Sequence, residues 1–200
     1  CAIVTDAGMP CISDPGEDLV RLCAENGIDT KVIPGPSAAV SALALSGLDT
    51  GKFVFEGFLQ PQANARRERL EELKLERRTI IFYEAPHKLC DTLNAMYQVL
   101  GERKITLARE LTKVYEEVIR TTLSQAVELY IQREPRGEFV LVVQGAKEEQ
   151  KLDFAQALAL VQALVERGEP LSKAAKDVAR QTGFKKGELY SGFLEMPAQE

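Results

Sequence analysis

Two glycine-containing loops are the segments of this sequence best suited to hold a ligand. The first is Thr5-Asp6-Ala7-Gly8, whose small side chains let a ligand approach the backbone. The second is Pro34-Gly35-Pro36-Ser37-Ala38, where a rigid turn precedes a helix cap with a hydroxyl and free N–H groups. Both can equally be ordinary strand-to-helix loops. Neither contains G-x-G-x-x-G or a Walker A pattern, which argues against NAD or ATP as the ligand.

Cysteine and histidine, which hold zinc and serve as nucleophile or base in many hydrolases, are few in this sequence. The four cysteines form no C-x-x-C pair and His87 is the single histidine, so the sequence argues against a zinc site. A Ser-His-Asp or Cys-His hydrolase would have to use His87 as its base, and no G-x-S-x-G elbow is present. We interpret Cys1, Cys11, Cys23 and Cys90 as free thiols and therefore expect a reducing, cytoplasmic location.

The composition is that of an ordinary globular protein of 200 residues, with 45% hydrophobic and 28% charged residues. The net charge of −5 excludes a wholly basic nucleic-acid coat but allows a local basic patch. No apolar run reaches the length of a membrane span, and no signal-peptide pattern opens the chain.

The elements that must position the two loops follow the grammar of a parallel α/β sheet. Residues 2–5 and 31–33 are predicted strands, each followed by a loop and then a helix. Residue 1 is Cys rather than Met, and residues 2–5 resemble a buried strand that lacks upstream neighbours. We therefore expect an N-terminally truncated chain in which residues 1–48 are the remainder of a first α/β domain.

Residues 49–146 are predicted to form a second α/β domain with a mixed sheet, since several strands follow one another in pairs. After a linker at 147–151, residues 152–200 have only helical periodicity and are predicted to be a C-terminal helical domain resembling a helix-turn-helix. The predicted strands of the second domain are 53–58, 79–83, 104–108, 115–120 and 139–143, and its predicted helices are 66–75, 86–100 and 124–131.

Six sequence blocks, in order along essentially the whole chain, closely resemble the tetrapyrrole methylase superfamily, and within it the branch that methylates ribosomal RNA. The blocks are Asp6-Ala7-Gly8-Met9-Pro10 with Ile12-Ser13-Asp14-Pro15-Gly16, Pro34-Gly35-Pro36-Ser37-Ala38, Phe53-Val54-Phe55-Glu56-Gly57-Phe58, Phe82-Tyr83-Glu84-Ala85-Pro86-His87, Ala108-Arg109-Glu110-Leu111-Thr112-Lys113, and Arg136-Gly137-Glu138-Phe139-Val140. Six blocks at family spacing are far more specific than any one of them.

The resemblance implies two α/β domains with S-adenosylmethionine (SAM) in the cleft between them. It implies methylation of a ribose 2′-hydroxyl on a cytidine of the small-subunit (16S) rRNA, and a C-terminal helical segment like the one after Leu152. The sequence departs from the family pattern because the family's first strand and its Pro/Gly-rich loop would precede Cys1. Met9 stands where a Thr is expected.

The same resemblance assigns cofactor contacts to residues of this chain. Asp6, Ala7 and Gly8 match the loop beneath the methionine part of SAM, and Cys11 lies in its continuation. The remaining matches are Ser37 and Ala38 in the second contact loop, and Glu84 and Leu111 in the second domain.

Ribose methylation also implies candidate catalytic residues, because a neutral 2′-hydroxyl is a poor nucleophile and needs a base or a nearby cation. We predict that Glu84 or Glu110 accepts the proton and that Lys113 or Arg109 holds a phosphate or the alkoxide. Each of these residues can equally be an ordinary surface charge. His87, in the first turn of a predicted helix, is as well suited to a capping role as to an RNA contact.

Two stretches are rich in basic residues. Residues 66–78 interleave six Arg or Lys with four Glu, which is typical of a solvated helix with i,i+4 ion pairs or of an arm that contacts rRNA phosphates. In the C-terminal segment, basic side chains gather around Gly183, as in a module that grips RNA or in a plain three-helix unit. They are Lys173, Lys176, Arg180, Lys185 and Lys186.

Three functions therefore remain open: an rRNA 2′-O-methyltransferase, a methyltransferase acting on a precorrin-type tetrapyrrole, and an inactive, truncated RNA-binding remnant. The basic stretches favour RNA, since a small macrocycle needs neither. The resemblance also implies a homodimer, and Phe53, Phe55 and Phe58 are candidates for its interface and equally for the core.

Overall fold

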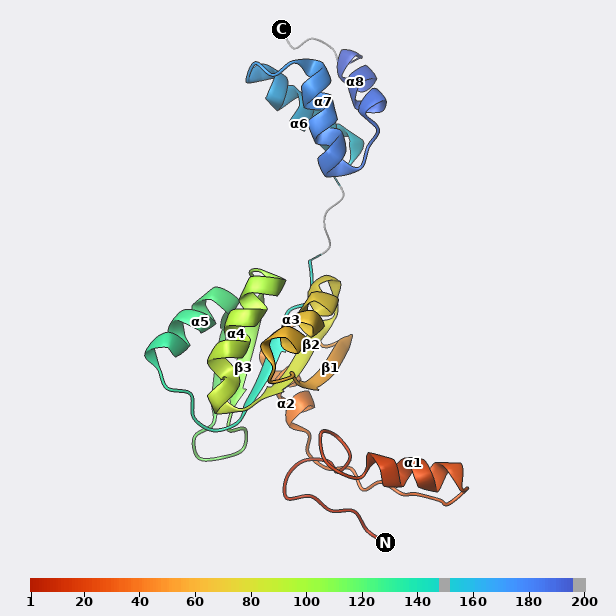
Figure 1. The fold of residues 1–200 in the computed structure, drawn as a ribbon, viewed down its shortest axis with the longest axis vertical. Coiled ribbons are helices and arrows are strands. Elements are labelled where there is room, and N and C mark those ends of the chain that lie inside the picture. Colours follow the sequence, from red (N-terminus) through yellow and green to blue (C-terminus); the bar gives the residue numbers. More distant parts are fainter. Residues whose placement is uncertain (148–151, 196–200) are drawn as a thin grey trace. The chain divides into compact units, whose positions relative to one another are not determined.

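The structure is a computed structural model that describes residues 1–147 and 152–195. The chain divides into two compact units, residues 1–147 and residues 148–200, and each is described by itself (Figure 1). Among the described residues, no helix is both long enough and apolar enough to cross a membrane.

The first unit is built on a five-stranded mixed sheet in the order β1-β2-β5-β3-β4. Strands β1 and β2 are parallel, and the β2–β5, β5–β3 and β3–β4 pairs are antiparallel. The predicted mixed sheet is thus confirmed. The strands are β1 Phe53–Phe58, β2 Thr79–Glu84, β3 Lys104–Arg109, β4 Glu117–Thr122 and β5 Phe139–Val143.

The register brings the carboxyl ends of β1, β2 and β3 to one edge of the sheet, together with the amino ends of β4 and β5. Glu84 is opposite Phe139, and Arg109 is opposite both Phe139 and Glu117. We call this the carboxyl edge. Loops that leave a sheet at such an edge are the usual place for a ligand site in α/β proteins.

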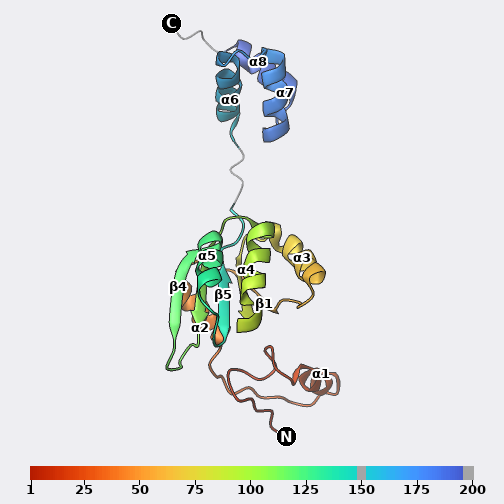
Figure 2. The same ribbon diagram turned by 60° about the vertical axis from the view of Figure 1, so that its left-hand side comes forward.

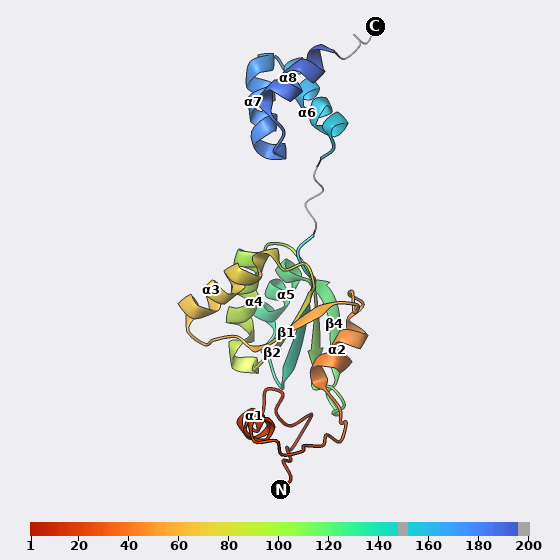
Figure 3. The same ribbon diagram turned by 90° about the vertical axis from the view of Figure 1, so that its right-hand side faces the viewer.

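Helices cover both faces of the sheet. Successive strand residues point to opposite faces, and here the side chains on both faces are apolar, so each face is covered by a layer of helices. On one face, side chains such as Phe82 and Leu141 pack against α3 (Ala63–Glu72), α4 (Pro86–Leu100) and α5 (Leu123–Gln132). On the other, Ile81 and Val142 pack against α2 (Ala38–Ser46). Figure 3 shows α2 alone on its side, with the other three helices opposite. A short 3₁₀ helix, Leu73–Leu75, follows α3.

The segment before the sheet contains α1 (Glu17–Glu25) and α2 (Ala38–Ser46), but the strands predicted at 2–5 and 31–33 are absent, and with them the parallel sheet expected in residues 1–48. The side chains of Val4 and Ile33 are 86% and 89% exposed. A strand forms only when a neighbour accepts its hydrogen bonds. No strand among the described residues pairs with either segment, so their β propensity has no effect here.

The second unit contains α6 (Phe154–Glu166), α7 (Leu171–Thr182) and α8 (Lys186–Leu194), shown in Figure 2. The C-terminal helical segment is therefore confirmed. Its helices have a core of their own, made of Ala157, Val161, Ala174, Ala175, Val178 and Leu189. The division into domains at 1–48, 49–146 and 152–200 stays a prediction.

Candidate functional site

The two loops that the sequence singles out lie against each other. The Gly35 N–H donates to the Met9 Sδ at 3.1 Å, and a Cβ placed on Gly35 would lie 3.7 Å from the Gly8 carbonyl oxygen. A Cβ on Gly8 would lie 3.9 Å from the Pro36 oxygen. The structure therefore brings residues 6–8 and 34–38 together.

The first loop is closed by a hydrogen bond from the Thr5 hydroxyl to the Asp14 carboxylate at 2.7 Å. Between these two residues the backbone turns through left-handed conformations at Gly8 (φ 76°) and Cys11 (φ 70°). Asp6, Ala7 and Gly8 are exposed, whereas Cys11 is partly buried. The loop thus presents small residues and one carboxylate to solvent around a fixed turn.

The second loop leads into α2, where Ser37 is the N-cap and its hydroxyl accepts from the Val40 N–H at 3.5 Å. Ala38 is exposed, and the next N–H, that of Ala39, donates to the Tyr83 hydroxyl at 3.2 Å. Tyr83 lies on β2 one residue before Glu84. The start of α2 is thereby tied to the carboxyl edge.

An aromatic cluster lies at this junction, and it includes two of the phenylalanines predicted as candidates for a dimer contact. The rings of Phe55 and Phe58 meet the Tyr83 ring edge to face, with centroids 4.9 Å and 5.6 Å away. A Cβ on Gly57 would lie 3.3 Å from the Ser13 hydroxyl, so the first loop also reaches β1. Phe58 and Tyr83 are register partners on the parallel strands β1 and β2. Correct pairing of these two strands is therefore the information that would have predicted the cluster.

Glu84 is placed at the end of β2 with its side chain turned inward. It is 3% exposed, and both carboxylate oxygens accept hydrogen bonds. The Thr92 hydroxyl donates to one at 2.6 Å and the Ala85 N–H donates to the other at 2.9 Å. Glu84 therefore connects β2 to α4.

Glu110 and Lys113 are brought together at the end of β3. The Lys113 ammonium lies 3.0 Å from the Glu110 carboxylate and 3.0 Å from that of Glu138. The pKa of Glu110 is lowered by the hydrogen bond from the Glu138 N–H, which is the larger cause, and by the one from Lys113. The pKa of Lys113 is raised by its hydrogen bonds to the Glu138 carboxylate, the larger cause, and to the Glu110 carboxylate. Leu111 packs partly buried against the α2 side of the sheet.

Arg109 belongs to a second ionic group. The Glu117 carboxylate lies 3.0 Å from the Arg109 guanidinium and 2.6 Å from that of Arg133. Both cations lower the pKa of Glu117, and Arg133 has the larger effect. The buried Nε of Arg109 has no hydrogen-bond partner among the residues that the structure describes. His87 is exposed in the first turn of α4.

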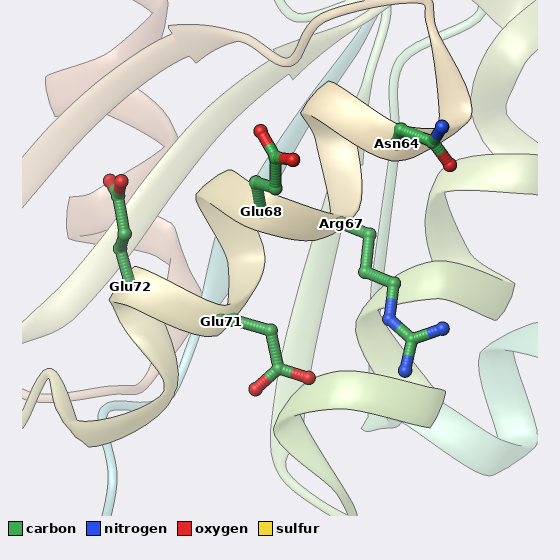
Figure 4. Close-up of a pocket in the computed structure, with 5 residues that line it drawn as sticks. All are labelled: Asn64, Arg67, Glu68, Glu71 and Glu72. Atoms are coloured by element: carbon green, nitrogen blue, oxygen red, sulfur yellow. The ribbon is translucent and has the colours of Figure 1, made fainter.

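Two surface hollows lie away from these residues. One, of about 480 Å³, is lined by Asn64, Arg67, Glu68, Glu71 and Glu72, all from the outer face of α3 (Figure 4). The other, of about 310 Å³, includes Gly47, Thr79 and Gln144 at the opposite edge of the sheet. A single exposed helix cannot enclose a ligand, so the place of the first hollow does not indicate a small-molecule site.

The basic side chains of residues 66–78 are largely paired. Arg69 contacts Glu56 at 2.8 Å and Glu72 at 2.5 Å, and Lys74 and Arg78 also pair with glutamates. Arg66 is only 8% exposed. This geometry favours a solvated helix stabilised by ion pairs over an arm that reaches for phosphates.

Among the described residues of the second unit, Lys176 and Arg180 on α7 and Arg167 after α6 form no ion pair with a carboxylate. By contrast, Lys173 pairs with Glu169 at 2.8 Å and Lys185 with Glu188 at 3.6 Å, and Lys186 donates to the Ser172 hydroxyl at 2.9 Å. In the described ranges, no group of three His, Cys, Asp or Glu side chains is arranged to hold a metal ion.

Comparison with known proteins assigns a family. The family model of the tetrapyrrole (corrin/porphyrin) methylases matches residues 1–127. Two curated relatives are each named ribosomal RNA small subunit methyltransferase I. The one from Synechocystis is 43% identical over 98% of this chain and 72% of its own length, and the one from Halalkalibacterium halodurans is 45% identical over 95% and 68%.

Solved structures agree on the fold. The methyltransferase CobJ superposes with a TM-score of 0.53 at 19% identity, over 70% of this chain and 62% of its own. The cobalt precorrin-4 methyltransferase CbiF superposes with a TM-score of 0.51 at 15% identity, over 68% and 61%. The chain thus spans about six-tenths of these two structures, and the predicted fold class is confirmed.

Proposed function

Because this chain belongs to the tetrapyrrole methylase family, and within it to the ribosomal RNA small subunit methyltransferase I proteins, we propose that it is a SAM-dependent rRNA methyltransferase. The proposed substrate is a ribose 2′-hydroxyl of a cytidine in the 16S rRNA of the small ribosomal subunit. The observation that carries the proposal is the contact between residues 6–8 and 34–38, beside the edge that bears Glu84 and Glu110.

The residues present fit the cofactor. Exposed Ala7, Gly8 and Ala38 leave room for a ligand against the backbone, and the Ser37 end of α2 suits a carboxylate such as that of SAM. Asp6 supplies a negative charge for a cationic ligand. SAM, when bound, supplies an electrophilic methyl group on sulfur. Cys11 and Leu111 complete the proposed set of contacts together with Glu84, which can take part only through its backbone because its carboxylate is buried and both oxygens accept hydrogen bonds.

Methyl transfer requires that the ribose oxygen, the methyl carbon and the sulfur be held in line, which is largely a matter of positioning. We place the ribose at the carboxyl edge, where Lys113 or Arg109 would hold a phosphate or the alkoxide. The candidate proton acceptors in this proposal are Glu84, which is buried with both oxygens hydrogen-bonded, and Glu110, which is paired with Lys113. Single-turnover rates of Glu84→Gln, Glu110→Gln and Lys113→Met proteins test these roles, and three unchanged rates would exclude all of them.

The function is tested by incubating the full-length protein with radiolabelled SAM and unmethylated 30S subunits. We expect label in 16S rRNA as a 2′-O-methylcytidine, located by nuclease digestion and mass mapping. The matched control is a Gly8→Val protein, in which the valine side chain would occupy the first loop. This variant should bind SAM at least tenfold more weakly than the wild type. No incorporation by a folded, SAM-binding wild-type protein would refute the proposal.

The second candidate is a tetrapyrrole methyltransferase. It is favoured by one observation, the fold shared with CobJ and CbiF, at identities below 20%. Label in a precorrin, but not in 30S subunits, would support it. A protein that binds rRNA but no SAM would instead be the inactive RNA-binding remnant.

Two further properties follow from this proposal. The protein would act in the cytoplasm, where ribosomal subunits are made, and it would form a homodimer. Phe53, 41% exposed on the edge strand β1, is a candidate for the dimer contact. Light scattering of the wild-type and Phe53→Ser proteins tests the dimer, since a monomeric wild type would exclude it.

A further inference from the structure

We propose that Glu110, Gly137 and Glu138 form a clamp that sets the turn after β3, and that Glu110 is a positioning residue for Lys113 rather than the proton acceptor. The catalytic part of this inference rests on the proposed methyltransferase function. The clamp itself is a statement about packing and can be tested without it.

The turn at residues 110–113 has an unusual backbone. Glu110 (φ 50°) and Thr112 (φ 66°) both lie in the left-handed region, although neither is a glycine. Such conformations cost free energy and persist only where neighbouring contacts hold them. The Lys113 N–H donates to the Glu110 carbonyl at 3.0 Å, which closes the turn.

The neighbouring contacts come from the segment just before β5. The Glu110 N–H donates to the Glu138 carbonyl at 3.0 Å, and the Glu138 N–H donates to the Glu110 carboxylate at 2.9 Å. Glu110 is therefore held to Glu138 through both its backbone and its side chain. This reciprocal pair extends the β3–β5 ladder by one residue beyond Arg109 and Phe139.

Gly137 makes room for the Glu110 side chain. A Cβ at position 137 would lie 2.5 Å from the Glu110 Cγ and 2.8 Å from its Oε1, closer than non-bonded atoms approach. Gly137 also has φ 80°, which any other residue would adopt at a cost. The close packing thus depends on the absence of a side chain at this position.

The clamp fixes the charge at the site. One oxygen of Glu110 already accepts both the Glu138 N–H and the Lys113 ammonium. A carboxylate stabilised in this way is a weak base, since its pKa is lowered. The same contacts hold the Lys113 ammonium at the carboxyl edge, where a phosphate or developing alkoxide would meet it.

The first test separates a base from a positioning residue. In a Glu110→Gln protein the amide oxygen can still accept the Glu138 N–H, so we expect kcat to fall less than about tenfold and the acidic limb of the pH–rate profile to remain. Loss of a general base would lower kcat by about 10²–10⁴-fold. A loss of that size in a folded protein, with the acidic limb abolished, would overturn the inference.

The second test measures the packing directly. Gly137→Ala should lower the melting temperature more than Gly101→Ala, because Gly101 also has positive φ (71°) but an added Cβ there meets nothing. In a Glu110→Ala background the clash is removed. Gly137→Ala should then cost no more than Gly101→Ala does. Equal losses at Gly137 and Gly101 in the wild-type background would refute the clamp.

The two proposals fail in different ways. If the wild-type protein methylates no RNA but the melting temperatures show the Glu110–Gly137 coupling, the proposed function is wrong and the clamp is right. If the wild type is active and the coupling is absent, the clamp is wrong and the function stands.

Discussion

Glu84 is a buried carboxylate with a hydrogen bond to each oxygen, a state that stabilises the protein only while both donors are present. Its side chain is 3% exposed, and Thr92 is the donor that a side-chain substitution can remove. Removing one partner leaves a buried polar group without its hydrogen bond, at a cost of about 1–3 kcal/mol.

We therefore expect Thr92→Val to lower the free energy of unfolding by about 1–3 kcal/mol, measured by urea denaturation at pH 7. Thr121→Val is the matched control, because the Thr121 hydroxyl donates to Gln125 on the surface. It should change stability by less than about 0.5 kcal/mol. Equal stabilities of the Thr92→Val and wild-type proteins would contradict this account of Glu84.

Tyr83 joins the second loop to the sheet through its hydroxyl. A Tyr83→Phe protein keeps the aromatic packing but loses the hydrogen bond from the Ala39 N–H, so we expect a loss of about 0.5–1.5 kcal/mol in stability and weaker SAM binding by calorimetry. Tyr97→Phe, at a 42% exposed position, serves as the control. Unchanged stability and affinity at Tyr83 would show that this bond does not hold the loop.

Sequence reasoning found the candidate residues at the ends of strands but not their partners. Glu84 and Glu110 each follow a predicted strand, which can be read from the sequence. Folding is needed to bring Thr92 to Glu84 and Ala39 to Tyr83. Ala39 and Tyr83 are 44 residues apart. Gly137 and Glu138 stood in a recognised block, but nothing in the order of residues shows that Glu110 packs on them.

At the scale of elements, local pattern located most of the first unit. Strands β1 and β5 and helix α4 have the predicted bounds, because apolar runs and Pro86 mark them clearly. Strand β4 begins at Glu117, two residues after the predicted start, since exposed Tyr115 lies in the turn before it. The strands predicted at residues 2–5 and 31–33 are absent because a strand forms only beside a partner strand.

Arg103 is an element-scale feature with no sequence signal. It is 8% exposed and donates to the carbonyls of Leu100, Gln144 and Lys74, at 3.3, 3.3 and 2.6 Å. One guanidinium thus satisfies backbone oxygens at the end of α4, just after β5 and in the 3₁₀ helix.

Arg103→Met should accordingly destabilise the first unit by about 2–4 kcal/mol, because the apolar replacement leaves three carbonyls without a donor. Thermal unfolding followed by circular dichroism provides the measurement. Arg136→Met, which removes an exposed pair with Glu134, should have little effect. Similar melting temperatures for the two variants would count against the bracing role of Arg103.

At the scale of the whole molecule, each unit has its own hydrophobic core, and the second one presents Lys176 and Arg180 on α7. These residues are four apart on a helix and therefore share a face. In the proposed function they are candidate side chains for contact with RNA phosphates.

The double variant Lys176→Glu/Arg180→Glu should bind 30S subunits more weakly. The slope of log K against log salt should fall by about 2, because each lost phosphate contact changes it by about one. SAM affinity should not change. Lys52→Glu/Arg136→Glu, with the same change of net charge on the first unit, controls for long-range repulsion. Equal weakening by both double variants would exclude a specific role for α7.

The strand order has a consequence for synthesis. Among the described strands, β5 is the last along the chain and the central one of the sheet, and it separates β1–β2 from β3–β4. Until residue 143 has left the ribosomal exit tunnel, the two halves can pair only within themselves, and both keep an unsatisfied edge. Completion of this sheet therefore awaits residues 139–143, and until then both two-stranded halves present an edge that can pair with another chain.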